Sequence, residues 1–131
     1  GLFPPASLKH GLGIGKPETL VGAWRAGYRL FDCVIPTRDG RHGRLYFFRE
    51  EPSGSALAGR KFYGEIGISA ERYARERRPV ESGCPCPLCT RYCAAYLHHL
   101  FAIRDAAGAR LATLHNLTFY ARLIGRLREM E

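Results

Sequence analysis

Cys84, Cys86 and Cys89 place three thiols within six residues of the chain. Pro85 and Pro87 stand between them, and prolines stiffen such a segment and keep it out of a helix. Thiolates at this spacing are typical of a zinc site, and a structural zinc ion takes four Cys or His ligands in a tetrahedron. The fourth ligand has four candidates later in the chain: Cys93, His98, His99 and His115.

The expected helices leave the choice of the fourth zinc ligand open. Cys93 follows Cys89 by four residues, so on a helix that begins at Thr90 it points the same way. His115 lies near the start of a second helix, which need not lie near the cysteine loop if the two helices are antiparallel. Three buried free thiols without a metal are the alternative, and the close spacing disfavours it.

A second group of residues able to do chemistry lies earlier in the chain. The apolar run from Leu30 to Ile35 carries one carboxylate, Asp32, and breaks at Pro36 into a loop that bears Arg38 and Arg41. A charged residue in such a run is costly to bury unless it is paired or used. Asp32 therefore has two interpretations. It is a structural carboxylate, which caps the loop or pairs with an arginine, or it is a catalytic carboxylate beside a phosphate-binding loop. Composition alone favours the structural interpretation.

The segments around Asp32 predict a β–α–β unit. Residues 10–15 alternate with glycine, which suits a strand end where a ligand approaches the backbone closely. They form neither a dinucleotide fingerprint, because the third glycine comes one residue early, nor a P-loop, because Pro17 follows the lysine. Pro17 suits the first turn of a helix and Gly27 its end. The strand 28–35 follows, and this order favours parallel pairing.

The middle of the chain predicts a hairpin and an exposed segment. Residues 44–48 and 62–68 have the composition of strands, and 52–59 between them is rich in turn-forming residues. Residues 71–78 form a run of charges, which we expect to be a solvated face or loop.

The C-terminal region predicts a pair of antiparallel helices. The first runs from Thr90 to Ala107 and ends at Gly108, and the second runs from about Leu111 to Met130. Apolar residues at helical spacing mark the expected inner faces, namely Tyr92, Tyr96, Leu100 and Ile103 in the first helix and Leu114, Leu117, Ala121, Ile124 and Leu127 in the second.

The overall composition restricts the class of protein and its partners. With 131 residues, 46% of them hydrophobic, the sequence is one domain's worth of globular chain. No apolar run approaches the roughly 18 residues of a membrane span, and no signal peptide is visible. A net charge of +8 favours polyanions as partners. Five cysteines, an odd number, favour a metal site in a reducing compartment, so we expect a cytoplasmic protein.

Four blocks of the sequence together resemble the C-terminal part of the tRNA-guanine transglycosylases, also called queuine tRNA-ribosyltransferases. The blocks are Gly13–Glu18, Phe31–Arg38, Cys84–Cys89 and Ala109–Asn116, with Phe119 and Tyr120 following. They occur in the order of the family, and the gap between the last cysteine and His115 also matches. The resemblance covers nearly the whole chain.

The resemblance implies an α/β fold: the C-terminal portion of a (β/α)8 barrel with a zinc-binding subdomain and a C-terminal helical pair. A whole barrel takes about 250 residues, so this chain supplies about two strand–helix units. We expect three regions: 1–43 with the nucleophile strand and the anticodon-loop-binding loop, 44–83 with the hairpin and an extended insertion, and 84–131 with the zinc subdomain and the last helices. Glu51–Lys61 looks inserted relative to the family.

The resemblance also implies an activity. The family exchanges guanine at the wobble position of GUN-anticodon tRNAs for a 7-deazaguanine base through a covalent aspartyl–ribose intermediate, and Asp32 matches its nucleophile. Leu12 and Gly13 match the wall of the base pocket. Arg38 and Arg41 match the contacts to the anticodon loop.

The metal ligands and partners follow from the same resemblance. It assigns a structural zinc ion to Cys84, Cys86, Cys89 and His115, and leaves Cys93, His98 and His99 with packing or surface roles. The expected partners are tRNA and the deazaguanine base, with no membrane. A second copy of the chain or an upstream barrel segment is also expected, because members of the family often form homodimers.

Three hypotheses about function follow. The chain is a piece of a transglycosylase that is catalytic only with the rest of the barrel, a non-catalytic zinc-containing RNA-binding or partner subunit of the same descent, or a zinc-stabilised structural domain. Asp32, Arg38 and Arg41 together favour the first hypothesis over the other two.

Overall fold

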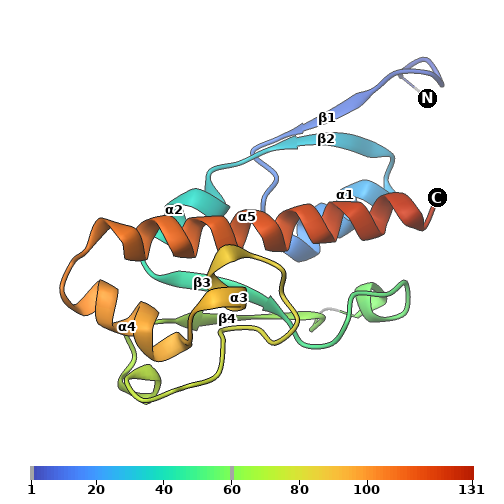
Figure 1. Cartoon of the computed structure of the whole chain (residues 1–131). Coiled ribbons are helices and arrows are strands. Elements are labelled where there is room, and N and C mark those ends of the chain that lie inside the picture. The colour runs from blue at the N-terminus through green and yellow to red at the C-terminus, as the bar shows by residue number, and fades with distance from the viewer. Residues whose placement is uncertain (1, 60) are drawn as a thin grey trace. The chain divides into compact units, whose positions relative to one another are not determined.

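The computed structural model describes residues 2–59 and 61–131. The chain is a mixed α/β protein that divides into two compact units, Gly1–Val34 and Ile35–Glu131. Figure 1 shows the order of the elements along the chain. In the described residues the strands form two separate two-stranded sheets, and neither closes into a barrel.

The first unit is the β–α–β unit that the sequence predicts. Strand β1 (Lys9–Leu12) and strand β2 (Tyr28–Asp32) pair in parallel, and helix α1 (Pro17–Arg25) connects them. Pro17 occupies the first turn of α1, and Gly27 turns the chain into β2 with a φ of 92°. Helix α1 buries one apolar face, which consists of Leu20, Val21 and Trp24. Strand β2 ends at Asp32, three residues earlier than predicted.

The segment that follows Asp32 is a helix, so the prediction of a loop there is wrong. Helix α2 (Ile35–Arg41) begins one residue before Pro36, where the missing N–H costs no helical hydrogen bond. Its Gly40 lies against Thr113: a Cβ atom added to Gly40 meets the Cα of Thr113 at 2.8 Å and its backbone nitrogen at 2.9 Å. Close backbone packing therefore supports a helix that is too short to show periodicity.

The predicted hairpin is confirmed. Strand β3 (Arg44–Phe48) and strand β4 (Tyr63–Gly67) are antiparallel, with Tyr46 opposite Glu65. The stretch Glu51–Lys61 connects them and contains a 3-10 helix, η1 (Ala56–Ala58), whose Leu57 is buried. Arg60, within this stretch, lies outside the described residues.

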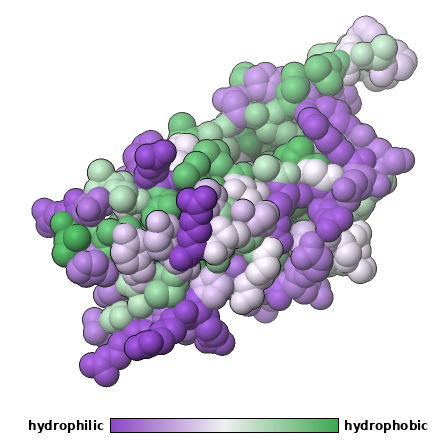
Figure 2. Space-filling model, in the orientation of Figure 1, coloured by the Kyte–Doolittle hydropathy of each residue, from purple (hydrophilic) through white to green (hydrophobic). Residues whose placement is uncertain are grey.

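Residues 71–78 are a solvated segment, as their charges predict. A 3-10 helix, η2 (Glu71–Tyr73), begins the segment, and most of its charged side chains are exposed. Figure 2 shows hydrophilic side chains over much of the face in view, including the lower left, where Figure 1 draws η2.

The single long helix predicted from Thr90 to Ala107 is wrong. The chain forms α3 (Pro87–Arg91) and α4 (Ala94–Ala102), and α5 (Ala106–Glu129) follows. Tyr92 is extended, with φ −134° and ψ 155°, and this interrupts the helix. Arg104 takes a left-handed φ of 57°, and the Asp105 side chain then caps α5 by accepting from the backbone N–H of Ala107.

Gly108 lies inside α5 and does not end the preceding helix. A Cβ atom at Gly108 meets the Cβ of Leu100 at 3.1 Å and the ring of Phe101 at 3.2 Å, so this glycine allows α4 and α5 to pack closely. The predicted pair of helices is therefore present with different boundaries.

The buried faces of these helices also differ from the prediction. In α4 the buried residues are Ala94, Leu97 and Leu100, whereas Tyr92, Tyr96 and Ile103 are exposed. Helix α5 buries a face displaced from the predicted stripe, on which two polar residues, His115 and Asn116, are also buried. Its buried residues are Gly108, Ala112, His115, Asn116, Phe119, Tyr120, Leu123 and Leu127, and the predicted Leu117 and Ala121 are exposed.

Aromatic rings from β3 and α5 fill the centre of the second unit. Phe48 and Phe119 stack with ring centroids 4.3 Å apart, and Tyr46 lies 5.8 Å from Phe119. Among the residues that the structure describes, no helix combines the length and the apolarity needed to cross a membrane.

Candidate functional site

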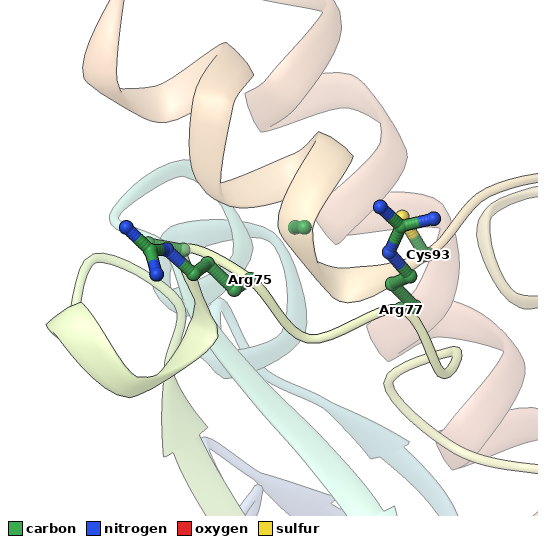
Figure 3. Close-up of a pocket in the computed structure, with 5 residues that line it drawn as sticks. Arg75, Arg77 and Cys93 are labelled. Atoms are coloured by element: carbon green, nitrogen blue, oxygen red, sulfur yellow. The ribbon is translucent and has the colours of Figure 1, made fainter.

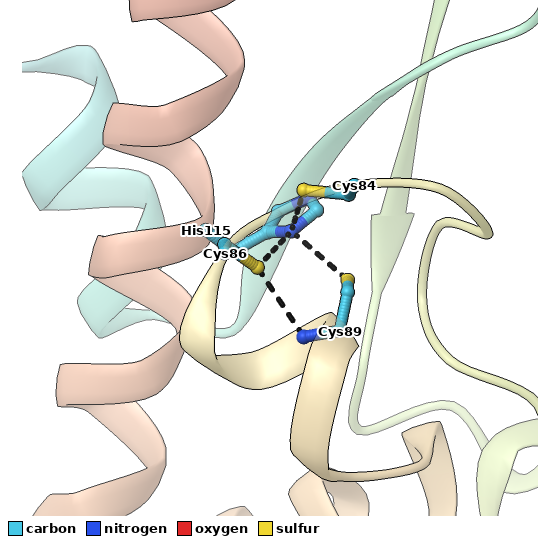
Figure 4. A group of neighbouring side chains, drawn as sticks. All are labelled: Cys84, Cys86, Cys89 and His115. Carbon is cyan, nitrogen blue, oxygen red and sulfur yellow. Dashed lines mark hydrogen bonds between the residues drawn. The ribbon is translucent and has the colours of Figure 1, made fainter.

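Four predicted metal ligands lie together in the second unit. Their ligand atoms, three sulfurs and one imidazole nitrogen, all lie within 4.8 Å of one another, and they belong to Cys84, Cys86, Cys89 and His115. Figure 4 shows the three thiols turned toward the imidazole of His115. The distances from its Nδ1 to the sulfurs of Cys84, Cys86 and Cys89 are 3.7, 3.4 and 3.4 Å.

These distances fit a tetrahedral zinc ion. At the usual Zn–S and Zn–N distances, about 2.3 and 2.0–2.1 Å, two ligands of a tetrahedron lie about 3.5 Å apart. The group also supplies four protein ligands, which is the closed set of a structural site rather than the open set of a catalytic one. Cys84, Cys86 and His115 are buried, and Cys89 is half-buried.

Hydrogen bonds hold both the cysteines and the histidine of this metal group, Cys84, Cys86, Cys89 and His115, in position. The Cys86 sulfur accepts from the backbone N–H of Cys89 at 3.3 Å, which caps the short helix α3. On the other side, Nε2–H of His115 donates to the carbonyl oxygen of Tyr46 at 2.6 Å. A carbonyl only accepts, so the proton is on Nε2 and the Nδ1 lone pair faces the thiols.

Asn116, the neighbour of His115, ties the metal group to the start of the second unit. Its Oδ1 accepts from the backbone N–H of Tyr46 at 3.1 Å, and its Nδ2 donates to the carbonyls of Pro36 at 3.1 Å and Arg44 at 2.9 Å. Asn116 is fully buried, so these bonds satisfy groups that water cannot reach.

The loop that carries the first cysteine is anchored by a buried ion pair. Glu81 accepts from the backbone N–H of Phe48 at 2.6 Å and from Arg122 at 2.5 Å. Burial raises the pKa of the Glu81 carboxyl, and the hydrogen bond from Phe48 and the charge of Arg122 oppose that rise. Hydrogen bonding to Cys84, and then to Cys89, lowers the pKa of the Cys86 thiol, whereas hydrogen bonding to Cys84, and then to Cys86, raises the pKa of Cys89. Without a metal, the proton therefore stays on Cys89 and Cys86 is the thiolate.

The other candidates for the fourth ligand lie outside the metal group. Cys93 is the N-cap residue of α4 and lies in an open hollow of about 680 Å³ with Arg75 and Arg77 (Figure 3). Because the helix breaks at Tyr92, the four-residue spacing from Cys89 does not turn its thiol toward the metal group. His98 donates from Nδ1 to the carbonyl of Ile68 at 2.8 Å, and His99 is exposed on α4.

The first unit brings Asp32 together with a histidine that the sequence did not single out. Nε2 of His10 lies 2.8 Å from Oδ1 of Asp32, and both side chains are partly exposed, by 44% and 62%. Leu12 pairs with Asp32 in the register of β1 and β2, and Gly13 follows with a φ of 67°. The carboxyl ends of two parallel strands therefore carry His10, Leu12, Gly13 and Asp32.

No local signal in β1 marks His10, because Lys9 on the same strand is another long polar side chain. Only the parallel register, which places His10 opposite Leu30, brings it within reach of Asp32 two residues later.

Arg38 and Arg41 lie on helix α2, in the second unit. Both side chains reach solvent; Arg38 is 53% exposed, and its Nε–H donates to Oδ1 of the buried Asp39 at 3.0 Å. The Tyr46 hydroxyl donates to the other oxygen of Asp39 at 2.5 Å. Neither Asp39 nor Tyr46 was predicted from the sequence as a site residue, because their hydrogen bond joins two separate elements, α2 and β3.

The contacts of Asp39 and Tyr46 determine which of the two carries a proton. Burial raises the pKa of Asp39, but the hydrogen bonds from Tyr46 and Arg38 outweigh it, and the pKa is lowered overall. Burial, and next the hydrogen bond to Asp39, raise the pKa of the Tyr46 hydroxyl above its usual value. Asp39 is therefore an acceptor and Tyr46 a donor at neutral pH.

The fold and the site define a mixed α/β protein with a Cys3His cluster that could hold a metal ion. Its sequence matches the family model described as Queuine tRNA-ribosyltransferase over residues 1–130. The chain belongs to the queuine tRNA-ribosyltransferase family.

Individual relatives agree with this assignment. The chain is 40% identical over 127 residues to a queuine tRNA-ribosyltransferase of Rickettsia akari, and 43% identical over 127 residues to one of Syntrophobacter fumaroxidans. Each alignment covers 97% of this chain, but only 31% of the first relative and 30% of the second. The chain thus spans less than a third of the length of these curated relatives.

Proposed function

We propose that this chain is the C-terminal part of a tRNA-guanine transglycosylase, in which Asp32 is the nucleophile and the rest of a (β/α)8 barrel completes the active site. The observation that carries this proposal is the place of Asp32 at the carboxyl end of a parallel strand, hydrogen-bonded to His10 and beside Leu12. Barrel enzymes place their catalytic groups at this end of their strands.

In the proposed reaction, a carboxylate oxygen of Asp32 attacks C1′ of the ribose. The glycosidic bond breaks, and guanine leaves with the bonding electron pair and takes up a proton. A ring nitrogen of the incoming 7-deazaguanine base then attacks C1′, loses its proton, and releases the carboxylate. A carboxylate suits this double displacement, because it both attacks and leaves an anomeric carbon.

Other residues of the chain take supporting roles in this proposal. His10 orients the carboxylate through its hydrogen bond, and Leu12 and Gly13 form part of the wall against the base. Arg38 and Arg41 contact phosphates of the anticodon loop, and the net charge of +8 supports a polyanionic partner.

Zinc has a structural role in the proposal and takes no part in the reaction. Cys84, Cys86, Cys89 and His115 hold it, and the bond from His115 to Tyr46 fixes α5 against β3. Region 1–43 then carries the nucleophile and the arginines, 44–83 the hairpin and insertion, and 84–131 the zinc subdomain, in a cytoplasmic enzyme.

The experiment is guanine exchange. The zinc-loaded chain, alone and joined to the upstream segment of a relative, is incubated with a GUN-anticodon tRNA and labelled guanine. We expect the joined form to incorporate label and to form a denaturation-resistant adduct with the RNA, and Asp32→Asn to do neither. Absence of both exchange and adduct in both forms refutes the proposal.

The competing candidate is a non-catalytic zinc-containing RNA-binding subunit of the same descent. Exposed Arg38 and Arg41 serve that role equally well, because it needs no completed barrel. Binding of the same tRNA without exchange, with a salt dependence that Arg41→Ala reduces, is the result that favours it.

A further inference from the structure

We propose that Asp39 and Tyr46 are positioning residues that hold the guanidinium of Arg38 ready for an RNA phosphate. The inference rests on the proposed function, in which Arg38 contacts RNA. Its basis is the pair of hydrogen bonds on Asp39, one oxygen of which accepts from Arg38 at 3.0 Å and the other from Tyr46 at 2.5 Å.

Tyr46 occupies a fixed position, so its hydroxyl holds Asp39 in place. Its backbone N–H donates to Asn116 and its carbonyl accepts from His115, so both backbone groups are tied to α5. Tyr46 is 4% exposed, and its ring packs against Phe119 and Tyr120. The position of the hydroxyl is therefore set by β3 and α5, and it fixes Asp39 from outside helix α2.

The hydrogen bond to Asp39 leaves the two terminal nitrogens of the Arg38 guanidinium available for a ligand. Only its Nε–H is bonded to Asp39, and in the described part of the chain no other hydrogen bond or ion pair of the Arg38 guanidinium is found. The two terminal nitrogens are the groups that a phosphate takes in a bidentate contact. Ordering a long side chain on binding costs about twofold to tenfold in affinity, and a tether that orders it beforehand removes that cost.

Plain electrostatics predicts the opposite effect of Asp39. A carboxylate beside a phosphate site repels RNA, so its removal strengthens binding if Asp39 acts only through its charge. If Asp39 positions Arg38, Asp39→Ala weakens binding although it removes a negative charge. Asp39→Asn separates the two effects, because its oxygen still accepts from Arg38 and its amide donates to the Tyr46 hydroxyl.

The test is an equilibrium titration of the zinc-loaded chain with a labelled anticodon stem–loop RNA that carries a GUN anticodon. We expect Asp39→Ala and Tyr46→Phe to bind about twofold to tenfold more weakly than wild type, and Asp39→Asn to bind at least as tightly. Zinc content and thermal unfolding identify any variant that loses its fold. Binding of folded Asp39→Ala that equals or exceeds wild type overturns the inference.

A double-mutant cycle shows whether Asp39 acts through Arg38. In an Arg38→Ala background, Asp39→Ala has no further weakening effect, whereas in the matched Arg41→Ala background it keeps its full effect. A merely structural role of Asp39 weakens both backgrounds alike, and that result also overturns the inference.

An RNA-free measurement keeps this inference distinct from the proposed function. We expect the 1H–15N resonance of Arg38 Nε–H to shift strongly in Asp39→Ala and less in Tyr46→Phe; an unchanged resonance refutes the tether. If wild type binds the RNA and Asp39→Ala binds equally well, this inference alone fails. If the wild-type chain binds no RNA, this inference fails, whereas the proposed function is decided separately by guanine exchange in the joined form.

Discussion

His10 and Asp32 meet across the parallel pair of strands, with Nε2 of the histidine 2.8 Å from Oδ1 of the carboxylate. The carboxylate only accepts, so the imidazole donates, and one oxygen of Asp32 is left to face solvent. A short contact between two partly exposed side chains adds little to stability, because water and salt screen it. Its effect is therefore on the orientation of the carboxylate.

If the joined form exchanges guanine as proposed, His10→Ala is expected to slow its adduct formation about tenfold, because an unrestrained carboxylate samples unproductive rotamers. The free energy of unfolding should change by about 0.5 kcal/mol or less. His10→Gln, whose amide also donates, should recover part of the rate. Lys9→Ala, on the same strand, is the matched control, and the adduct is followed by denaturing gel. A His10→Ala rate equal to wild type contradicts the prediction.

Cys86→Ala or His115→Ala is expected to abolish binding of one equivalent of zinc and to unfold α3–α5, because structural zinc contributes directly to folding. Cys93→Ala is the matched control, since this thiol lies outside the metal group, and it should keep both zinc and helicity. Metal analysis and circular dichroism measure the two effects. Loss of zinc from Cys93→Ala, or its retention by both ligand variants, excludes this ligand set.

Gly40→Ala is expected to destabilise the chain by about 1–3 kcal/mol, because its Cβ falls within 3 Å of the backbone of Thr113, which cannot give way as a side chain does. Gly125→Ala is the matched control on α5, where a Cβ meets nothing within 4 Å. It should stabilise the chain by about 0.5–1 kcal/mol. Urea denaturation measures both, and equal effects would show that α2 does not pack on α5 as described.

Tyr46 should make stability depend on alkaline pH. Because its pKa is raised in the fold, the hydroxyl contributes stability that is fully present below its unfolded pKa of about 10 and is lost as pH rises above that value. The difference in free energy of unfolding between wild type and Tyr46→Phe should therefore be constant up to about pH 9 and shrink above about pH 10. Urea denaturation across this range measures it; a difference that stays constant throughout contradicts the prediction.

The local signals of the sequence were sufficient for the β–α–β unit, the hairpin and the three cysteines. Proline and glycine mark the ends of α1. The prediction that prolines keep the cysteine segment out of a helix holds for Cys84 and Cys86 but is wrong for Cys89, because Pro87 occupies the first turn of α3. These features depend on residues close together in the chain.

The structural features that the sequence did not predict depend on contacts between residues that are far apart along the chain. Helix α2 is stabilised by Gly40 against Thr113, and α5 buries the polar His115 and Asn116 because Tyr46 provides partners for them. Hydrophobic periodicity counts such polar residues as outward-facing. The left-handed Arg104, which turns α4 into α5, carries no mark in the sequence.

The pairing of β1 with β2 has a practical consequence for handling this chain. Within the described residues each of these strands pairs with only one neighbour, so its outer edge presents backbone donors and acceptors to whatever extended peptide it meets. Parallel strands are ordinarily covered on both faces, whereas Leu12 and Leu30 are exposed here by 76% and 47%. An unpaired edge of this kind favours pairing with another chain. Self-association of the protein should therefore increase with its concentration unless another strand pairs with this edge.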